Sequence, residues 1–133
     1  MRAPGTSERR WQRRNLAAVP RDPAAIPETD LAAIRRFCEQ NSPAEHAHHL
    51  RVEFGVRGKA VTIYECRPPW DDDGSEWTRQ PIGQLRYDPQ DQRWRLFWAD
   101  RNDRWHAYEM LGPAGIKRVL TELDSDPTCI FWG

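Results

Sequence analysis

Two segments of the chain repeat apolar residues at the three- and four-residue spacing of an amphipathic helix. In the first segment these residues are Leu31, Ile34, Phe37 and Cys38. In the second they are Ile116, Val119, Leu120 and Leu123. The pattern predicts two helices, each with one buried face. Thr29 or Asp30 is expected to cap the start of the first helix, and Asp126-Pro127 to end the second.

Between these segments the apolar period changes to two, which is typical of strands with one buried face. Five such runs cover residues 50–56, 60–66, 82–88, 93–100 and 104–109. Short polar turns such as Arg57-Gly58-Lys59 separate several of them, so neighbouring strands are expected to pair antiparallel. In the fourth run Trp94, Leu96 and Trp98 share one face, and Arg93, Arg95 and Phe97 share the other.

The element order predicts an α+β fold: a five-stranded antiparallel meander sheet with an N-terminal and a C-terminal helix packed on one face. The apolar end of the chain, "TCIFWG", is expected to dock on the domain. We predict a single α+β domain over residues 26–133. Residues 1–25 have few apolar side chains, several prolines and clustered arginines, and we predict a disordered tail there.

Charge and cysteine content narrow the class of protein. The 20 basic and 20 acidic residues give the 133-residue chain a net charge of zero, so no global field attracts it to nucleic acid or membrane. The arginines of residues 1–25 exceed the acidic residues there, which leaves a basic arm for nucleic acid as an alternative. The 3 cysteines are widely spaced and no apolar run approaches a membrane span, so we predict a cytoplasmic protein without membrane contact.

Two tryptophans, Trp70 and Trp77, flank an acidic turn after the second strand. Pro68-Pro69 ends that strand, since proline lacks the backbone donor that a ladder needs. We expect the two tryptophans to lie near each other. They either cap one end of the core or form an aromatic cleft beside acidic groups, suited to a cationic or ring-shaped ligand. Arg67 precedes this loop and is included in the candidate site.

A metal site is not expected. Cys38 and the histidines His46, His48 and His49 lack the paired spacing of structural zinc sites. Cys38 also lies on the apolar face of the first helix, where packing explains it. We therefore predict neither a metal nor another cofactor.

The turn after the fourth strand holds Asp100, Arg101 and, shortly beyond it, His106. An acid and a histidine near a turn suggest general acid–base chemistry. No nucleophile with a base partner is visible in the sequence, and aspartate at a hairpin turn commonly bonds the backbone. Arg93 and Arg95 beside Trp94 and Trp98 suggest single-strand stacking, but alternation places these arginines and tryptophans on opposite faces.

Several stretches together carry a resemblance: "VTIYECRPPW", "EWTRQPIGQLRYD", "RWRLFWADRNDRWHAYE" and the terminal "DPTCIFWG". In this order and spacing they resemble the bacterial domain-of-unknown-function 3024 family of small single-domain proteins. The resemblance covers roughly residues 31–133. It implies a fold and a cytoplasmic bacterial setting, and it carries over no activity and no site residues.

We therefore predict a small bacterial protein that acts as a non-enzymatic binding or protein-interaction module, with a protein or a small ligand as partner. The candidate binding residues are Arg67, Trp70, Trp77, Asp100, Arg101 and His106. Two alternatives stay open. One is an enzyme that uses the 100–106 hairpin, and the other is a nucleic-acid accessory protein that uses the basic N-terminal arm.

Overall fold

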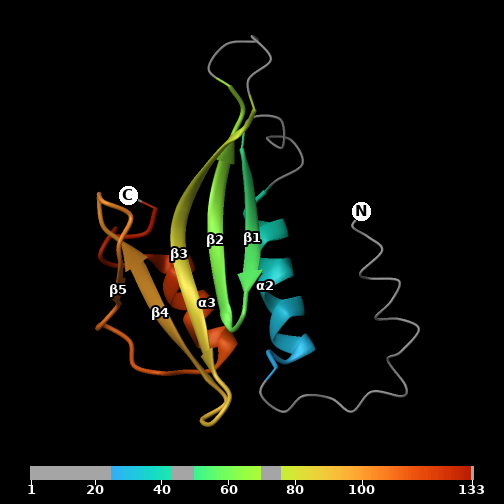
Figure 1. Ribbon diagram of the computed structural model, residues 1–133, viewed down its shortest axis with the longest axis vertical. Helices are drawn as coiled ribbons and strands as arrows, with labels where there is room; N and C mark the ends of the chain where they lie inside the picture. Colours follow the sequence, from blue (N-terminus) through green and yellow to red (C-terminus); the bar gives the residue numbers. More distant parts are fainter. Residues whose placement is uncertain (1–24, 43–49, 70–75, 133) are drawn as a thin grey trace, which may run out of the picture.

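The computed structural model describes residues 25–42, 50–69 and 76–132, and it confirms the predicted α+β fold. The helices are α2 (Glu28–Gln40) and α3 (Ile116–Ser125). The strands are β1 (Arg51–Arg57), β2 (Ala60–Arg67), β3 (Thr78–Asp88), β4 (Arg93–Ala99) and β5 (Trp105–Ala107). All neighbours pair antiparallel in the order β1-β2-β3-β4-β5, a meander (Figure 1).

Both helices cover the same face of the sheet and lie behind it in Figure 1. Helix α2 contacts β1 and α3, and α3 also contacts β4. The largest fully buried side chains come from both helices and from β2, β3 and β4: Trp94, Ile34, Ile63, Leu85, Leu96, Leu123, Val61 and Val119. The apolar stripes of both predicted helices therefore form the core, as their spacing indicated.

The predicted cap of the first helix is wrong. Pro27 occupies the N-cap position, and no side chain caps the helix. Asp30 instead accepts a hydrogen bond from the indole of Trp94, with Oδ2 2.8 Å from Nε1. The Trp94 side chain is fully buried, and a buried indole N–H needs an acceptor. Asp30 therefore accepts a hydrogen bond from a core side chain instead of from the backbone at the start of the helix.

Strand β3 begins at Thr78, four residues before the predicted start, and contains a β-bulge. Ile63 pairs with Gly83 and Tyr64 pairs with Pro81, so Ile82 is the extra residue. Pro81 is tolerated here because β4 pairs only with Gln84 and later residues of β3. Side chains alternate across a strand, and one extra residue reverses the alternation beyond it.

The bulge places small and apolar residues against the helices. Ile82 and Gly83 are both buried. A Cβ at Gly83 would lie 3.3 Å from side-chain atoms of Leu123 and Phe131, so any larger residue would push these side chains outward by a few tenths of an ångström. The same bulge brings Arg79 onto the sheet face that Arg86 occupies, since both then pair with residues of β2 that point away from the helices.

The apolar C-terminal end docks on the core, as predicted. Phe131 is buried, and its ring centroid lies 5.0 Å from that of Tyr108. Trp132 donates from Nε1 to the carbonyl of Leu123 at 2.8 Å. Asp126, which ends α3 in the left-handed conformation, accepts the backbone N–H groups of Phe131 and Trp132. The helix end thus fixes the segment that follows it.

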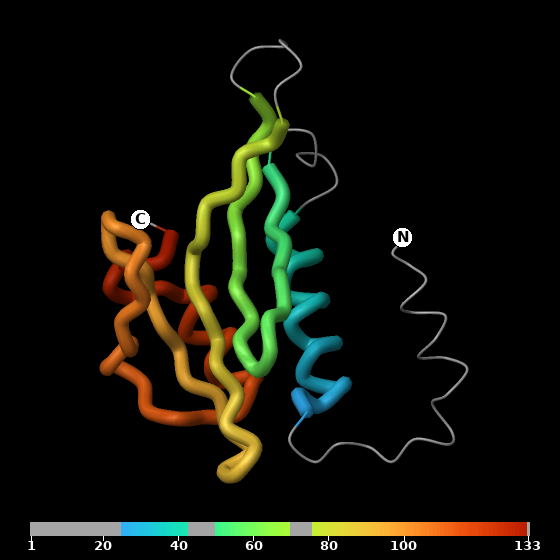
Figure 2. Tube along the Cα trace, viewed as in Figure 1, coloured from blue at the N-terminus to red at the C-terminus, as the bar shows by residue number. Residues whose placement is uncertain are grey.

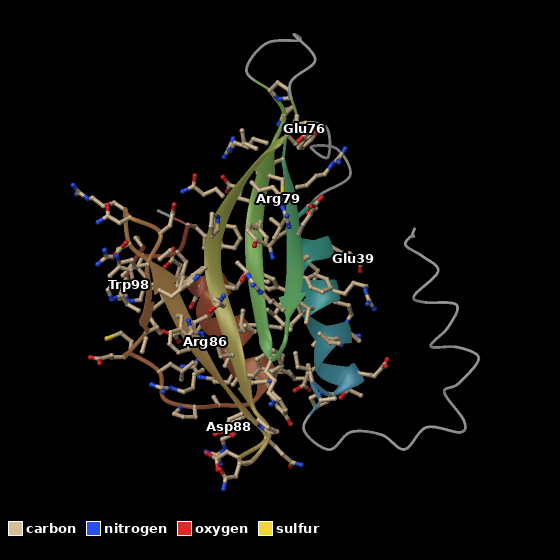
Figure 3. All side chains as sticks on the ribbon, in the orientation of Figure 1. Glu39, Glu76, Arg79, Arg86, Asp88 and Trp98 are labelled. Atoms are coloured by element: carbon tan, nitrogen blue, oxygen red, sulfur yellow. The ribbon has the colours of Figure 1, made fainter. Side chains whose placement is uncertain are left out.

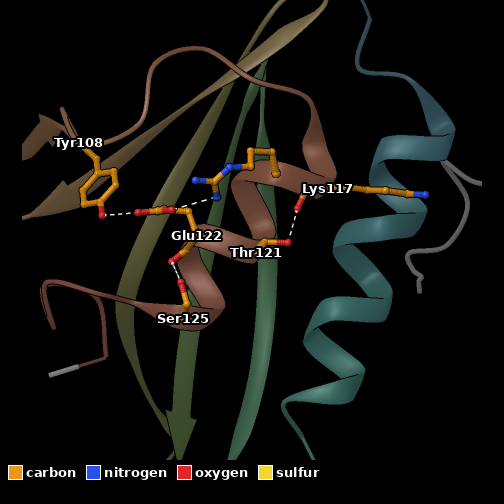
Figure 4. Close-up of polar contacts among 6 residues, drawn as sticks. Tyr108, Lys117, Thr121, Glu122 and Ser125 are labelled. Carbon is orange, nitrogen blue, oxygen red and sulfur yellow. Dashed lines mark hydrogen bonds and ion pairs between the residues drawn. The ribbon is translucent and has the colours of Figure 1, made fainter.

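One carboxylate enters the buried layer. Glu122 of α3 is 7% exposed and accepts a hydrogen bond from the Tyr108 hydroxyl at 2.7 Å (Figure 4). Its other oxygen lies 2.9 Å from Arg118 Nη1, one turn earlier on the helix. Burial raises the pKa of Tyr108, and the Glu122 carboxylate raises it further. The charge is therefore paired at the edge of the core rather than left alone.

Three predictions fall on residues that the structure does not describe. They are the tail, of which residues 1–24 are outside the described ranges, the histidines at 46–49, and Trp70 with the acidic turn at 70–75. They stay predictions. Within the described residues, no helix is long and apolar enough to cross a membrane.

Candidate functional site

The sheet face opposite the helices is uncovered by any described element, and we call it the open face (Figure 1). Its side chains follow from the strand register. From β1 and β2 they are Arg51, Glu53, Gly55, Arg57, Ala60, Thr62, Tyr64 and Cys66. From β3 to β5 they are Arg79, Pro81, Gln84, Arg86, Asp88, Arg93, Arg95, Phe97, Ala99, Trp105 and Ala107.

The open face is strongly basic. Six of its side chains are arginines, and two are carboxylates, Glu53 and Asp88. The whole chain has a net charge of zero, with 20 basic and 20 acidic residues. Positive charge is therefore concentrated on one side of the sheet, where it creates a local field that the net charge does not reveal.

Arginine side chains on the open face lie over aromatic rings. The Arg79 guanidinium carbon is 4.0 Å from the Tyr64 ring centroid, and that of Arg86 is 3.8 Å from the Phe97 centroid. Arg95 approaches the same Phe97 ring at 5.7 Å. Figure 3 shows Arg79 and Arg86 over the sheet at different levels. The ring quadrupole attracts each cation and holds its planar guanidinium near the sheet.

A row of low, half-exposed side chains crosses all five strands between these arginines. Its members are Gly55, Thr62, Gln84, Phe97 and Ala107, and we call it the floor row. Gln84 donates to the Thr62 hydroxyl at 3.0 Å and accepts from Arg86 Nε at 2.7 Å. The next row is the arginine row, Arg57, Ala60, Arg86 and Arg95. The floor row is therefore polar in its middle, and a guanidinium lies over each half: that of Arg86 over Phe97, and that of Arg79 within 3.9 Å of a Cβ at Gly55.

Beyond the floor row, strands β2 and β3 extend as a twisted ribbon (Figure 2). Trp77 precedes β3 and lies under Arg51, whose guanidinium carbon is 4.0 Å from the ring centroid. Arg67 pairs with Glu65 at 3.0 Å and stays exposed. Trp70 lies outside the described residues, so its expected proximity to Trp77 is untested. Trp77 thus continues the pattern of rings under arginines.

The β4–β5 turn contains the predicted Asp100, Arg101 and His106. Asp100 Oδ1 accepts the backbone N–H groups of Asn102 at 2.8 Å and Arg104 at 3.0 Å. Its Oδ2 lies 2.7 Å from His106 Nε2. The hydrogen bond from His106, followed by the backbone bonds, lowers the pKa of Asp100 to about 2. All these contacts of the carboxylate lie within the turn and stabilise it, as aspartates at hairpin turns commonly do.

His106 also stacks on Trp98, with ring centroids 4.6 Å apart and an interplanar angle of 26°. A groove of about 440 Å³ adjoins this pair, lined by Ala107, Tyr108, Met110, Thr128 and Ile130 among others. A second groove of about 540 Å³ lies between α2 and β1, with Cys38 in its wall. Burial raises the pKa of the Cys38 thiol to about 12, which suppresses the nucleophilic thiolate.

The structure does not bring the predicted site residues together. Trp77 and Arg67 lie at the β2–β3 end, whereas Asp100, Arg101 and His106 lie at the β4–β5 turn, apart from it in Figure 2. Among the described residues, no group of three His, Cys, Asp or Glu side chains is placed to hold a metal ion.

Sequence reasoning missed the ring and arginine pairs of the open face. The opposite placement of Arg95 and Trp94 is confirmed. However, Tyr64 and Phe97 share the face of the arginines, so rings and cations do form one surface. The period-two pattern was the available signal for Phe97, but the bulge at Ile82 hid the placement of Arg79.

Comparison with known proteins gives a family and no activity. A family model described as "Domain of unknown function (DUF3024)" matches residues 22–133. No match was found among curated proteins or among solved structures. The matched range contains every described helix and strand. The chain therefore belongs to the DUF3024 family.

Proposed function

We propose that this chain is a small bacterial cytoplasmic protein that works as a non-enzymatic binding module, and that the open face binds an anionic partner. One observation carries the proposal: the sheet surface that the helices leave uncovered has six arginines and only two carboxylates. Clustered charge of one sign raises the local concentration of oppositely charged partners and speeds their association.

The arginines are prepared for contact with a partner. Arg79, Arg86, Arg93 and Arg95 are all exposed. Rings beneath Arg79 and Arg86 limit the positions of the guanidinium groups, which lowers the entropy lost when a partner binds. Guanidinium groups also present several donors in a planar fork that suits carboxylate and phosphate oxygens.

The residues predicted from sequence take positions around this surface. We propose that Trp77, with Trp70, extends the binding surface along the β2–β3 ribbon, and that Arg67, on the other side of this ribbon beside Glu65, adds a cation at its edge. Arg101 is exposed at the β4–β5 turn and adds a cation at the other side, on a turn that Asp100 and His106 hold in shape.

Salt elution from a heparin column tests the proposal, because heparin is a generic polyanion. The variant Arg79→Gln/Arg86→Gln/Arg95→Gln removes three open-face charges. A matched control, Arg35→Gln/Arg36→Gln/Arg104→Gln, removes three exposed charges outside the open face. We expect the first variant to elute at much lower salt than the wild type and the control to elute near it. Equal losses in both variants would contradict a localised surface.

A further inference from the structure

The open face has the dimensions of a track for an extended chain. The floor row lies between the arginine row on one side and the row of Glu53, Tyr64 and Pro81 on the other, with Arg79 one row further. Successive rows on one face are two residues apart, or about 7 Å. The backbone positions of Arg79 and Arg86 are therefore about 20 Å apart along β3, counted as three rows. Their guanidinium groups reach inward, over Tyr64 and Phe97, so a short single strand laid on this surface would meet cations along its length.

The chemistry of the track fits bases as well as phosphates. Nucleic-acid bases stack on aromatic rings and on the planes of arginine guanidinium groups. Phe97 and Tyr64 each lie beneath a guanidinium, so a base that stacks on Arg86 or Arg79 forms a layered stack with the ring below. The amide of Gln84 and the hydroxyl of Thr62 lie in the floor, where they can exchange their mutual hydrogen bond for bonds to a base edge.

We propose that the anionic partner of the open face is single-stranded nucleic acid, which rests on the function proposed above. A duplex keeps its base faces inside the stack and would use the arginines alone. An acidic protein would match the charge, but it would leave the stacking planes of the guanidinium groups over Tyr64 and Phe97 unused. A single strand uses all three: cations for phosphates, guanidinium–ring stacks for bases and the floor for base edges.

Fluorescence anisotropy with labelled oligonucleotides tests this inference on the full-length chain. The probes are mixed-sequence single-stranded RNA and DNA of about 12 nucleotides, within the ~4–16 nucleotide site sizes of small sheet-based binders, and a duplex of equal length. We expect the wild type to bind the single strands at least about 10-fold more tightly than the duplex, because base–aromatic stacking has this order of effect.

Variants assign the binding to the open face. Phe97→Leu keeps an apolar side chain but removes the ring, and we expect it to lower single-strand affinity about 10-fold, while Phe97→Tyr keeps wild-type affinity. Arg95→Gln should reduce the slope of log affinity against log salt by about 0.7, the value for one phosphate contact on a single strand. Each variant must match the wild type in far-UV circular dichroism and melting temperature. If Phe97→Leu does not fold, Arg95→Gln is the variant that assigns binding to the open face.

The outcomes separate the inference from the proposed function. Equal affinity for single strand and duplex, or no effect of Phe97→Leu, would overturn the single-strand inference while heparin binding still supports an anion-binding face. Loss of oligonucleotide binding only when Arg9, Arg10, Arg13 and Arg14 are replaced by Gln would assign it to the N-terminal arm and overturn the inference. Failure to bind either heparin or oligonucleotides would overturn both proposals.

Discussion

The two faces of the sheet are built from alternate residues of the same strands, yet their polar side chains have different kinds of partner. On the covered face two buried ring donors have carboxylate partners, in the bond from Trp94 to Asp30 and that from Tyr108 to Glu122. On the open face Arg79 and Arg86 lie over the rings of Tyr64 and Phe97. The covered face is arranged for stability, since an unsatisfied buried polar group is costly.

The ion pairs of the described residues sharpen this contrast. They join Arg67 to Glu65, His106 to Asp100 and Arg118 to Glu122. None of them includes Arg57, Arg79, Arg86, Arg93 or Arg95. The six arginines of the open face outnumber its two carboxylates and therefore repel one another. This repulsion disfavours the fold slightly unless an anion binds. Surfaces that lower stability in the absence of a partner are expected at functional sites.

The largest loss of stability is expected on the covered face. Leu123 is fully buried, and its side chain contacts the site of Gly83. Leu123→Ala should lower the free energy of unfolding by about 2–5 kcal/mol, because it removes buried methyl groups and leaves a cavity. Urea denaturation measures the change. An unaltered midpoint would mean that α3 does not pack on the sheet as described.

A smaller loss is expected at the buried carboxylate. Tyr108→Phe removes the hydroxyl that donates to Glu122 and leaves that carboxylate with Arg118 alone. The free energy of unfolding should fall by about 1–3 kcal/mol, the cost of a buried charged group that loses one donor. Thr121→Ala is the control, because its hydroxyl bonds the exposed side of the same helix. If both variants lose the same amount, the Tyr108 bond has no special role.

The fold could be predicted from the sequence because the spacing of apolar residues and the turn residues between them indicate each element. The three- and four-residue spacings of Leu31, Ile34 and Cys38 identified a buried helix face, and alternation in β4 placed Trp94 inward. Prediction failed where a side chain bonds a residue far away in the sequence. Asp30 was expected to cap its own helix, but its acceptor is used by Trp94, 64 residues away in sequence.

The binding surface was harder to predict for a related reason. A single extra residue, Ile82, reverses the alternation of β3, and nothing in the local pattern shows which residue bulges. Arg79 was therefore not placed beside Tyr64 before the structure was known. Trp77 was selected for its size, and it does lie against a cation, Arg51. The hairpin residues were correctly placed at a turn, but their contacts serve that turn.

At the β4–β5 turn the expected effect depends on pH. The pKa of Asp100 is lowered from 3.8 to about 2, so the ionised carboxylate stabilises the folded chain above its ordinary pKa. This contribution is lost as the pH falls through about 2. Carboxyl-carbon NMR should show the low midpoint in the wild type, and His106→Ala should raise it, since His106 is the largest cause of the shift. A wild-type midpoint near 3.8 would contradict the geometry of the turn.

The smallest change in stability is expected on the open face, and there the comparison of the two faces is decided. Arg86→Ala removes one guanidinium from the Phe97 ring and one hydrogen bond to Gln84. An exposed cation–π contact is worth about 0.5–1 kcal/mol. Relief of repulsion within the arginine row offsets part of that, so we expect the free energy of unfolding to change by less than about 1 kcal/mol. Urea denaturation at low and at high salt measures the change. High salt screens the repulsion and should make Arg86→Ala slightly more destabilising relative to the wild type, because only the favourable contact then remains. A loss as large as that of Leu123→Ala would show that the open face is part of the stabilising core, and its arginines would no longer be a surface held ready for a partner.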